Sequence, residues 1–422
     1  MSAERILVVG GGGREHALAW RIKQDRPRAQ LFVAPGNGGS AALAANVPIA
    51  ATDIDALAAW CREQPPDLVV IGPDDPLAAG IVDALAGEGL RVFGPTAAAA
   101  RIEASKAWAT EICAAAGAPI PESHVFDDPD AAEAFVREHD AVYVVKADGL
   151  ALGKGVIVPE TVADTVAAVD RLGRQKALGA AGDRLVLQQK LSGREASVFA
   201  LCDGSDHHVI GVARDYKRIG DGDTGPNTGG MGAYTPPADV DDELLTAIED
   251  RIIAPVLAEM RRAGAPFTGF LYAGLMLTED GPVVIEFNSR MGDPEAQVVL
   301  PLLRFDLAAA MEAAIDGRLA ELELPPPVGA ATCVVLASGG YPGTYEPGQP
   351  ISGIDQTGPD TLVFQAGTKA VDGQLLTSGG RVLAVTGLGT SVPQATARAY
   401  AGAEQVEFEG AVRRSDIAAG AT

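Results

Sequence analysis

Cysteine is scarce in this sequence, and long apolar runs are missing. The four cysteines among 422 residues lie far apart and form no closely spaced pair. Because zinc sites and disulfide frameworks need clustered cysteines, this spacing argues against both and fits free thiols in a reducing compartment. No run approaches the roughly 18 apolar residues of a transmembrane helix, and the N-terminus MSAERILVVGGGG lacks the apolar stretch of a signal peptide. We therefore expect a cytoplasmic protein without a membrane partner.

Positive charge is also in short supply, because 33 lysines and arginines stand against 56 acidic residues, which gives 33 − 56 = −23. Sequence-independent binding to nucleic acid depends on basic side chains that neutralise phosphates, so we expect no nucleic-acid partner. Lysine itself occurs only 8 times, against 25 arginines. Five lysines lie in the motifs described below, which predicts a compact basic site within an acidic surface. These are Lys106, Lys146, Lys154, Lys217 and Lys369.

Apolar segments that alternate with helical patterns organise the N-terminal region. Short segments suited to buried strands occur at 5–9, 31–35, 67–73 and 91–95. An amphipathic helical pattern at 53–63 lies between two of them. Because strands that alternate with helices are typical of parallel sheets, we predict a three-layer α/β domain at 1–103.

The middle region, 104–325, changes to paired strands. The helical pattern SKAWATEICAAAG should end at Gly117, since two prolines follow it. We expect the strand at 183–191 to pair with the one at 194–202, and a long helical segment at 241–263. The proline-rich segment at 322–329 predicts a linker, after which residues 326–422 should form a small C-terminal α/β domain.

The glycine loop GGGGREHA at 10–17 suggests a dinucleotide site but does not match its pattern. Counting from Gly10 or Gly11 puts Glu15 or His16 where the third glycine of GxGxxG is required. What remains is a glycine turn at a helix N-terminus, which favours an anion such as phosphate. A tight turn without a ligand explains the loop equally well.

The segment VVKADGLALGKGV carries Lys146 and Lys154 around a glycine-rich loop. It is no P-loop, because the final Ser or Thr is missing and a strand rather than a helix follows. Backbone N–H groups and a lysine at the loop tip could close over a polyphosphate. The alternative is an exposed hairpin turn.

The strand VVIEFN brings Glu286 and Asn288 to one face, with Val284 beside them and Ile285 and Phe287 on the other. A carboxylate beside an amide oxygen suits a hard cation such as Mg²⁺. The alternative is a solvated strand end. Arg290, Asp293 and Glu295 follow at once.

The glycine-rich stretch 220–232 is no calcium loop, because Gly232 stands where a bidentate Glu is needed. It predicts a mobile substrate loop that follows Lys217 and Arg218. With the lysines and the acid–amide pair, it describes metal-assisted phosphoryl transfer, in which positioning and charge neutralisation carry most of the catalysis.

On these motifs the chain resembles the ATP-grasp ligases, and among them the phosphoribosylamine–glycine ligases (glycinamide ribonucleotide synthetases) of purine biosynthesis. The resemblance covers nearly the full length. It rests on GGREHALAW (12–20), APGNGG (34–39), GPDDPL (72–77), FGPT (93–96), SKAW (105–108), KADGLALGKGVIV (146–158), DTGPNTGGMGAY (223–234), TGFLYAGLM (268–276), IEFNSRMGDPE (285–295), GGYPG (339–343), AGTK (366–369) and GGRVL (379–383).

The resemblance implies an ATP-grasp body at 104–325 with a lid at about 122–192, and ATP between them. It implies that ATP converts glycine to a glycyl phosphate, which the amine of 5-phosphoribosylamine attacks to give glycinamide ribonucleotide, ADP and phosphate. The small-molecule substrates would be glycine and 5-phosphoribosylamine, the metal Mg²⁺ or Mn²⁺, and the protein a monomer.

The resemblance also implies a role for each matching residue. Arg290, Lys146 and Lys154 would be catalytic, and Glu286 and Asn288 would bind the metal. ATP would be bound by Lys106, Lys146, Gly149, Gly153, Lys154, Gly155, Gln188, Gln189, Leu191 and Glu195. The other substrates would be bound by Gly12, Gly13, Arg14, Asp74, Lys217, Arg218, Asp293, Lys369 and Arg381.

Three motifs depart from the family pattern, at four residues. Gln188-Gln189 stand where the hinge usually reads Glu-Glu, Tyr216 stands where His is usual, and Asp74 replaces Glu in the usual GPE.

Three other functions are alternatives to glycine ligation. They are an ATP-grasp ligase that uses bicarbonate on an aminoimidazole ribotide, a nicotinamide-dependent oxidoreductase and a non-catalytic nucleotide-binding regulator.

Overall fold

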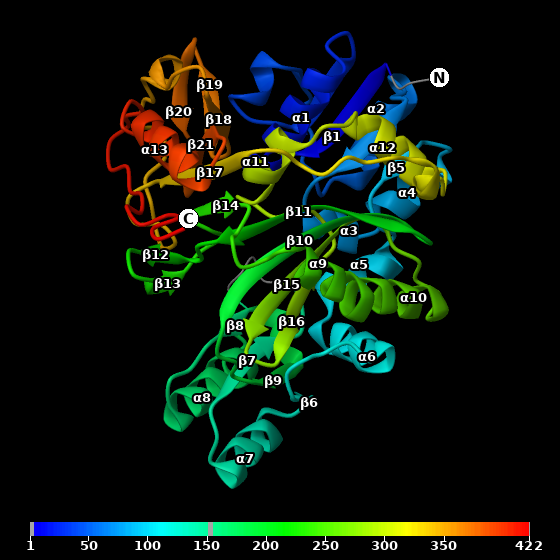
Figure 1. The fold of residues 1–422 in the computed structure, drawn as a ribbon, viewed down its shortest axis with the longest axis vertical. Helices are drawn as coiled ribbons and strands as arrows, with labels where there is room; N and C mark the ends of the chain where they lie inside the picture. The colour runs from blue at the N-terminus through cyan, green and yellow to red at the C-terminus, as the bar shows by residue number, and fades with distance from the viewer. Residues whose placement is uncertain (1–3, 151–154, 422) are drawn as a thin grey trace.

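The structure is a computed structural model, in which residues 4–150 and 155–421 are described. Figure 1 shows the N-terminal strands and helices at the upper right, C-terminal strands at the upper left and a smaller sheet with its own helices at the bottom. We call this smaller part, residues 123–189, the lid. Within the two described ranges, no helix combines the length and the apolar character needed to cross a bilayer.

The N-terminal sheet has five parallel strands in the order β3-β2-β1-β4-β5. Alternate residues of β1 face two separate cores, because Ile6 and Val8 pack toward α1 and α12 while Leu7 and Val9 pack toward α2 and α4. Helices on both faces of a parallel sheet confirm the predicted three-layer α/β fold. The strands are β1 (Arg5–Gly10), β2 (Gln30–Pro35), β3 (Ala45–Asn46), β4 (Leu68–Ile71) and β5 (Val92–Phe93). The helices are α1 (Gly13–Asp25), α2 (Ile54–Glu63), α3 (Asp74–Ala78), α4 (Ile81–Gly87) and α12 (Leu307–Ile315).

One eight-stranded sheet runs through the body and into the C-terminal part, in the order β16-β15-β10-β11-β14-β17-β21-β18. The crossing point is the antiparallel pair of β14 and β17, so the C-terminal strands extend the body sheet. Helix α13 (Val392–Ala403) and the hairpin of β19 (Thr368–Val371) and β20 (Gln374–Thr377) complete this part. The eight strands are β10 (Arg194–Asp203), β11 (His207–Asp215), β14 (Gly232–Thr235), β15 (Thr268–Thr278), β16 (Gly281–Asn288), β17 (Ala330–Ala337), β18 (Thr361–Gln365) and β21 (Arg381–Gly389).

Two hydrophobic cores hold the body sheet from its two faces. One core contains Val198, Leu271 and Phe287 and packs against α5, α6, α9 and α10. On the other face, Phe199 and Tyr272 belong to the core that includes α1 and α12, which fixes the body to the N-terminal sheet. The helices are α5 (Ala97–Ala104), α6 (Lys106–Ala116), α9 (Asp242–Ile248) and α10 (Ala254–Arg262). Helix α6 ends at Gly117 as predicted, with Gly117 in the left-handed conformation.

The lid is an antiparallel sheet in the order β6-β9-β7-β8, with α7 and α8 packed on it (Figure 1). The prediction that 183–191 pairs with 194–202 is therefore wrong. The short link between β9 and β10 looks like a hairpin in the sequence, but in the fold it carries the chain from one sheet to another. The elements are β6 (Ser123–Phe126), α7 (Pro129–His139), β7 (Tyr143–Ala147), β8 (Val156–Ile157), α8 (Val162–Val169) and β9 (Leu185–Gln189).

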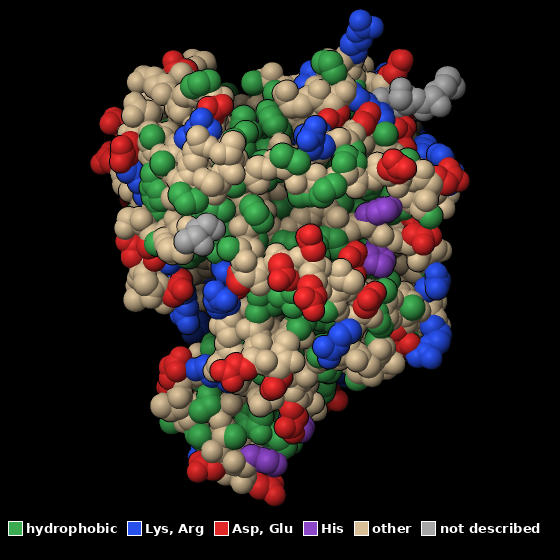
Figure 2. Space-filling view, in the orientation of Figure 1, with side chains coloured by type: hydrophobic (Ala, Val, Ile, Leu, Met, Phe, Trp, Pro, Cys, Tyr) green, Lys and Arg blue, Asp and Glu red, His purple; other side chains and the backbone are tan. Residues whose placement is uncertain are grey.

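The acidic side chains are spread over the surface. Figure 2 shows Asp and Glu side chains over the N-terminal part, the body and the lid on the visible face. A dispersed surface charge agrees with the expectation that the excess of 23 negative charges belongs to the solvated exterior.

His16 links the N-terminal and C-terminal parts. It lies on α1, is 7% exposed and accepts a hydrogen bond on Nδ1 from the backbone N–H of Gln365 at 2.8 Å. Its ring also meets that of Phe364 edge-on at 5.8 Å between centroids. Burial lowers the pKa of His16 from 6.5 to about 4, so the folded protein favours the neutral ring.

This contact predicts acid-sensitive stability. Between pH 6.5 and 4 the unfolded chain binds a proton that folded His16 does not, so stability should fall as the pH falls, by about 3 kcal/mol in total from this residue. Above pH 6.5 the contribution is fully present. Urea unfolding at pH 7, 6 and 5 should give a steeper decline for the wild type than for His16→Gln. Equal slopes in the two proteins would contradict the prediction.

Candidate active site

A β-bulge in β16 sets the direction of the proposed metal ligands. The register against β15 shifts, so that Gly274 pairs with Glu286 and Leu275 with Val284, and Ile285 is the extra residue. Val284 and Phe287 consequently enter the same hydrophobic core. The prediction that Val284 shares the face of Glu286 and Asn288 is therefore wrong, because the bulge breaks the alternation between them.

Lys146 uses the backbone that this bulge exposes. From lid strand β7, its Nζ donates a hydrogen bond to the carbonyl of Ile285 at 2.7 Å. The side chain is 5% exposed, and burial lowers the pKa of Lys146 to about 8. The lid and the body thus meet at an amine that sits beside Glu286.

The carboxylate of Glu286 lies among cations from several elements. Burial alone would raise the pKa of Glu286, but the charges of Lys217, Lys146, Lys106 and Arg290 lower it below the ordinary value. Glu286 therefore stays ionised. The prediction of one basic cleft is met by Lys106, Lys146 and Lys217, whose charges all act on this carboxylate.

Lys106 begins helix α6 and ties it to the loop after β7. Its Nζ donates to the carbonyl of Gly149 at 2.9 Å, and Asp148 accepts from the backbone N–H of Ala107 at 3.1 Å. Gly155 closes the other side of this loop, because its carbonyl accepts from Ala147 at 2.8 Å. The predicted site residues Gly153 and Lys154 lie outside the described residues.

Lys217 follows β11, and two carboxylates lie beside its ammonium group. It forms an ion pair with Glu195 of β10, and Asp215 lies 3.7 Å from its Nζ. Burial raises the pKa of Asp215 to about 7, and the charge of Lys217 opposes this rise. The structure therefore places Lys217 on the Glu286 side of the site, together with Glu195.

The predicted hinge residues lie where β9 leaves the lid. Gln188 is buried and donates from Nε2 to the Ser123 hydroxyl at 3.0 Å, so its side chain serves the lid sheet. Gln189 has an exposed side chain, and its N–H donates to the Glu122 carbonyl at 2.9 Å. Leu191 follows at the end of this link, half-buried.

Arg290 is fixed by a buried acid, Glu103, that belongs to none of the sequence motifs. Glu103, at the end of α5, accepts from Arg290 at 2.6 Å and from the Ser289 N–H at 2.8 Å and hydroxyl at 2.9 Å. Arg290 also donates to Oδ1 of Asn288 at 3.2 Å. Its buried Nε has no hydrogen-bond partner among the described residues, which leaves one donor for a ligand. Burial raises the pKa of Glu103, and Arg290 opposes that rise.

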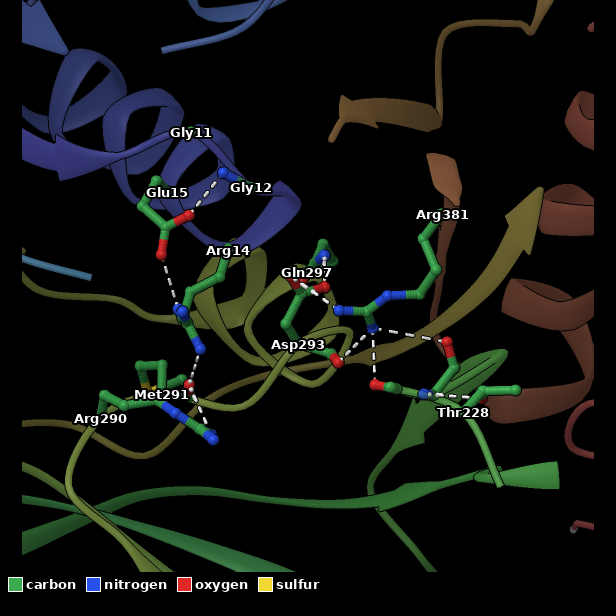
Figure 3. Close-up of polar contacts among 12 residues, drawn as sticks. Gly11, Gly12, Arg14, Glu15, Thr228, Arg290, Met291, Asp293, Gln297 and Arg381 are labelled. Carbon is green, nitrogen blue, oxygen red and sulfur yellow. Dashed lines mark hydrogen bonds and ion pairs between the residues drawn. The ribbon is translucent and has the colours of Figure 1, made fainter. Parts of the chain in front are cut away.

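The glycines of the N-terminal loop make room for Glu15. Its carboxylate accepts from the Gly12 N–H at 2.6 Å and from Arg14 Nε at 2.7 Å (Figure 3). A Cβ on Gly10 or on Gly72 would lie 2.3 Å from atoms of this side chain. The loop is thus built around an internal carboxylate that fixes Arg14, which explains why the dinucleotide pattern fails.

Gly72→Ala should accordingly cost about 1–3 kcal/mol of stability, because the added methyl group overfills the space that Glu15 occupies. Gly87→Ala is the matched control, since Gly87 ends α4 and a Cβ there would meet no atom of the described chain within 4 Å. Urea unfolding of both variants tests the prediction. Equal stability of the two would contradict it.

Asp293 joins all three parts of the chain. Arg381 of β21 lies 3.3 Å from its carboxylate and also donates to the Gly229 carbonyl at 2.6 Å. Gln297 donates to the other carboxylate oxygen at 2.8 Å. Figure 3 shows Arg14 and Arg290 directed at the Met291 carbonyl beside this cluster; Arg14 lies 3.0 Å from that oxygen. Gly13 contacts the same group, because a Cβ there would lie 2.5 Å from Gln297.

Asp74 belongs to the same neighbourhood, at the first residue of α3. Its negative charge acts on both Glu103 and Arg290. The structure therefore brings Gly12, Gly13, Arg14, Asp74, Asp293 and Arg381 toward Arg290.

Two predicted site residues are directed elsewhere. Arg218 donates to the Gly225 carbonyl at 2.7 Å, within its own hairpin. Lys369 is exposed on β19, and Figure 1 shows β19 in the C-terminal part and β16, the strand of Glu286, in the body. The prediction that five lysines share one cleft is wrong for Lys369, because the AGTK motif folds into a separate hairpin.

A metal would need ligands from outside the protein. Within residues 4–150 and 155–421, no group of three or more His, Cys, Asp or Glu side chains is arranged to hold an ion. Glu286 and Asn288 supply oxygen donors, the chemistry that Mg²⁺ prefers, and Mg²⁺ commonly takes its other ligands from water and phosphate. The residues present therefore fit a cation that arrives with a nucleotide.

Comparisons with known proteins agree with this geometry. A lid that meets an antiparallel body over a lysine-rich site defines an ATP-grasp enzyme, and the ATP-grasp domain model of phosphoribosylglycinamide synthetase matches residues 104–296. Models of the N and C domains of the same family match 4–103 and 331–420. The chain belongs to the phosphoribosylamine–glycine ligase family.

Individual relatives cover the whole chain. A phosphoribosylamine–glycine ligase of Rhodopirellula baltica is 45% identical, over 99% of this chain and 98% of its own. The trifunctional purine biosynthetic protein adenosine-3 of Gallus gallus is 45% identical over 98% of this chain and 42% of its own length. The solved phosphoribosylamine–glycine ligase of Thermotoga maritima has a TM-score of 0.84 at 32% identity, covering 98% of this chain and 100% of its own. A biotin carboxylase domain from Hydrogenobacter thermophilus shares the fold alone, at 14% identity and a TM-score of 0.76 over 98% and 92% of the two chains.

Proposed function

We propose that this chain ligates glycine to 5-phosphoribosylamine at the expense of ATP, giving glycinamide ribonucleotide, ADP and phosphate. The observation that carries the proposal is the convergence of Lys106, Lys146, Lys217 and Arg290 on the carboxylate of Glu286, where lid and body meet. Buried and half-buried cations around an ionised acid suit a metal–polyphosphate ligand. The names of the full-length relatives support the choice of substrates.

On the ATP side, we assign the phosphates to Lys106, Lys146 and the loop from Gly149 to Gly155, which includes Gly153 and Lys154. Glu195, beside Lys217, would accept hydrogen bonds from the ribose, and the backbone from Gln188 to Leu191 would meet the base. Glu286 and Asn288 would hold Mg²⁺ or Mn²⁺, which would neutralise charge on the phosphates.

On the amine side, we assign the ribosylamine to Gly12, Gly13, Arg14, Asp74 and Asp293, with Arg381 as the partner of Asp293. We assign Lys369 to the ribotide phosphate, because the first residue of its hairpin, Thr368, accepts from the Gly38 N–H at 3.2 Å, and the neighbouring Asn37 donates to the Gly11 carbonyl at 3.0 Å. Arg218 we assign to the structure of its own hairpin, because its guanidinium already bonds there.

The chemistry needs no covalent enzyme intermediate. The γ-phosphoryl group passes to a glycine carboxylate oxygen, the amine nitrogen attacks the carbonyl carbon, and phosphate leaves as the amine loses a proton. Arg290 lies between the two sides and carries an unpaired buried donor, so we assign it to the negative charge that develops on the transferred group and on the acyl oxygen.

We also propose domain limits of 1–103, 104–325 and 326–422, with the lid at about 122–192. The separate lid sheet and the lack of helix or strand at 322–329 support these limits.

The test is ADP formation by the purified chain with ATP, Mg²⁺, glycine and phosphoribosylamine generated from ribose 5-phosphate and ammonia. We expect ADP to form only when both co-substrates are present. Bicarbonate in place of glycine distinguishes the related ligases, and repetition with Mn²⁺ compares the metals. ADP formation with bicarbonate but not with glycine, or none in any mixture, would overturn the proposal.

A further inference from the structure

The C-terminal segment 414–418 is bonded to the hairpin formed by β12 (Arg218–Gly220) and β13 (Thr224–Asn227). We call this segment the clasp. Its first residue, Arg414, has the largest fully buried side chain among the described residues, with 1% exposure. Arg414 is not among the residues assigned to the reaction. Its burial has to be explained by its partners, because a buried charge is costly unless it is paired and hydrogen-bonded.

Arg414 reaches both the clasp and the hairpin. Its guanidinium makes a two-pronged bond with Asp416, both contacts 2.7 Å, which fixes it within the clasp. It also donates to Asp223 at 2.7 Å and to the Arg218 carbonyl at 3.1 Å, across the base and the tip of the hairpin. Its Cζ lies 4.8 Å from the ring centroid of Tyr216.

Further bonds follow the same path between the two segments. Ser415 donates from its N–H to Asp221 at 2.8 Å, and the Gly222 N–H donates to Asp416 at 2.8 Å. The Ala418 N–H donates to the Tyr216 hydroxyl at 2.9 Å. The clasp therefore contacts the hairpin from the start of β12 to the turn that follows it.

The two ends of this hairpin lie in the proposed site. At one end is Lys217, which pairs with Glu195. At the other end Thr228 donates to the Lys217 carbonyl at 2.7 Å, and the Gly229 carbonyl accepts from Arg381, the partner of Asp293. A shift of the hairpin would thus move groups on both the ATP side and the amine side.

We propose that Arg414 is a positioning residue for the ligase reaction, which holds the β12–β13 hairpin so that Lys217 and the Gly229 carbonyl keep their places. This inference rests on the proposed function. Arg414 touches no reacting atom in this scheme; it acts through Asp223 and the Arg218 carbonyl.

Three variants test the clasp. Arg414→Lys keeps a charge but loses the planar fork, and Arg414→Met removes both. Asp223→Asn removes the negative charge of one partner on the hairpin side, where the side chain is 68% exposed and the backbone φ of +53° suits Asn. Arg413→Met is the matched control, because Arg413 donates at 2.7 Å to the Ala403 carbonyl of α13 instead of to the hairpin.

Steady-state kinetics with each substrate varied in turn should separate positioning from loss of structure. For Arg414→Lys and Asp223→Asn we expect KM for phosphoribosylamine and KM for ATP both to rise, by up to about tenfold, while kcat stays within about twofold. Amide hydrogen exchange should be faster at 219–227 in these variants and unchanged at β10 and β15. Arg413→Met should match the wild type in both measurements.

The outcomes are distinct. Folded Arg414→Lys and Asp223→Asn with wild-type KM values and wild-type exchange at 219–227 would overturn the proposal, as would an equal loss in every kinetic parameter with lowered stability. If Arg414→Met does not fold, Asp223→Asn decides. A wild-type chain that forms no ADP in this assay would refute the proposed function instead, while the exchange measurement would still report whether Arg414 holds the hairpin.

Discussion

Glu286→Gln is expected to lower kcat by at least about 10³-fold, because it removes the one charge in the proposed metal pair while keeping the side-chain shape. The charges of Lys217, Lys146, Lys106 and Arg290 hold the carboxylate ionised, so the neutral amide would remove a negative charge that these cations share. Loss of that counterion should weaken the binding of metal and nucleotide as well as turnover.

Binding of Mn²⁺ in the presence of ADP, followed by electron paramagnetic resonance, gives a readout that does not depend on turnover. We expect the variant to bind Mn²⁺ at least about tenfold more weakly, since carboxylates are the preferred ligands of hard cations. Glu279→Gln is the matched control, because Glu279 is an exposed acid on the turn between the same two strands. Wild-type Mn²⁺ affinity and turnover in Glu286→Gln would exclude Glu286 as a metal ligand.

Glu103→Gln should have the second largest effect, on both stability and rate. Removing one member of a buried ion pair leaves the other charge uncompensated, which commonly costs about 3–5 kcal/mol. Glu103 pairs with Arg290 at 2.6 Å and also accepts two bonds from Ser289, so the segment that carries the arginine would lose its anchor. We expect kcat to fall about 10²-fold through the misplaced guanidinium.

Urea unfolding and kinetics of Glu103→Gln should be compared with Glu111→Gln, a change at an exposed position of the adjoining helix α6. KM for ATP should change little, because Glu103 acts on Arg290 rather than on the lid lysines. A variant that unfolds like the wild type and turns over within about threefold of it would show that Arg290 does not depend on Glu103.

The sequence predicted the parts of the site that are carried by local motifs. Lys106, Lys146 and Glu286 come together because each lies at a fixed place on a helix start or a strand, and the periodicity of those elements can be read directly. The helix end at Gly117 is predictable for the same reason, since glycine is favoured in the left-handed cap.

Features that depend on distant pairing could not be predicted. The bulge at Ile285 arises from the register against β15, and no residue in VVIEFN signals it. The partners of β9 lie on both sides of it in the lid, although β10 is its nearest neighbour in sequence. The role of Glu103 could not be predicted, because nothing in the sequence distinguishes it from other acids on helices. Its partners come into contact only when α5 packs against the segment that follows β16.

The glycine-rich N-terminus was misleading for a related reason. Sequence patterns associate such loops with ligands, but Gly10 and Gly72 are small here because Glu15 fills the space. Glu15 could have predicted this internal contact, because an acid at the third helical position commonly bonds back to the backbone at the helix N-terminus.

The pairing of β14 with β17 makes the C-terminal part difficult to remove from the rest of the chain. The proline-rich segment at 322–329 looks like a natural place to cut the chain, and the family models leave a gap there between residues 296 and 331. A fragment that ended at this segment would lose β17, and β14 would become an open edge with unpaired backbone groups and the apolar side chains of Ala233 and Tyr234 beside it. Open edges of this kind recruit strands from other molecules. The C-terminal quarter therefore covers this edge and keeps the remainder soluble, and expression of the two fragments together should succeed where the first alone aggregates.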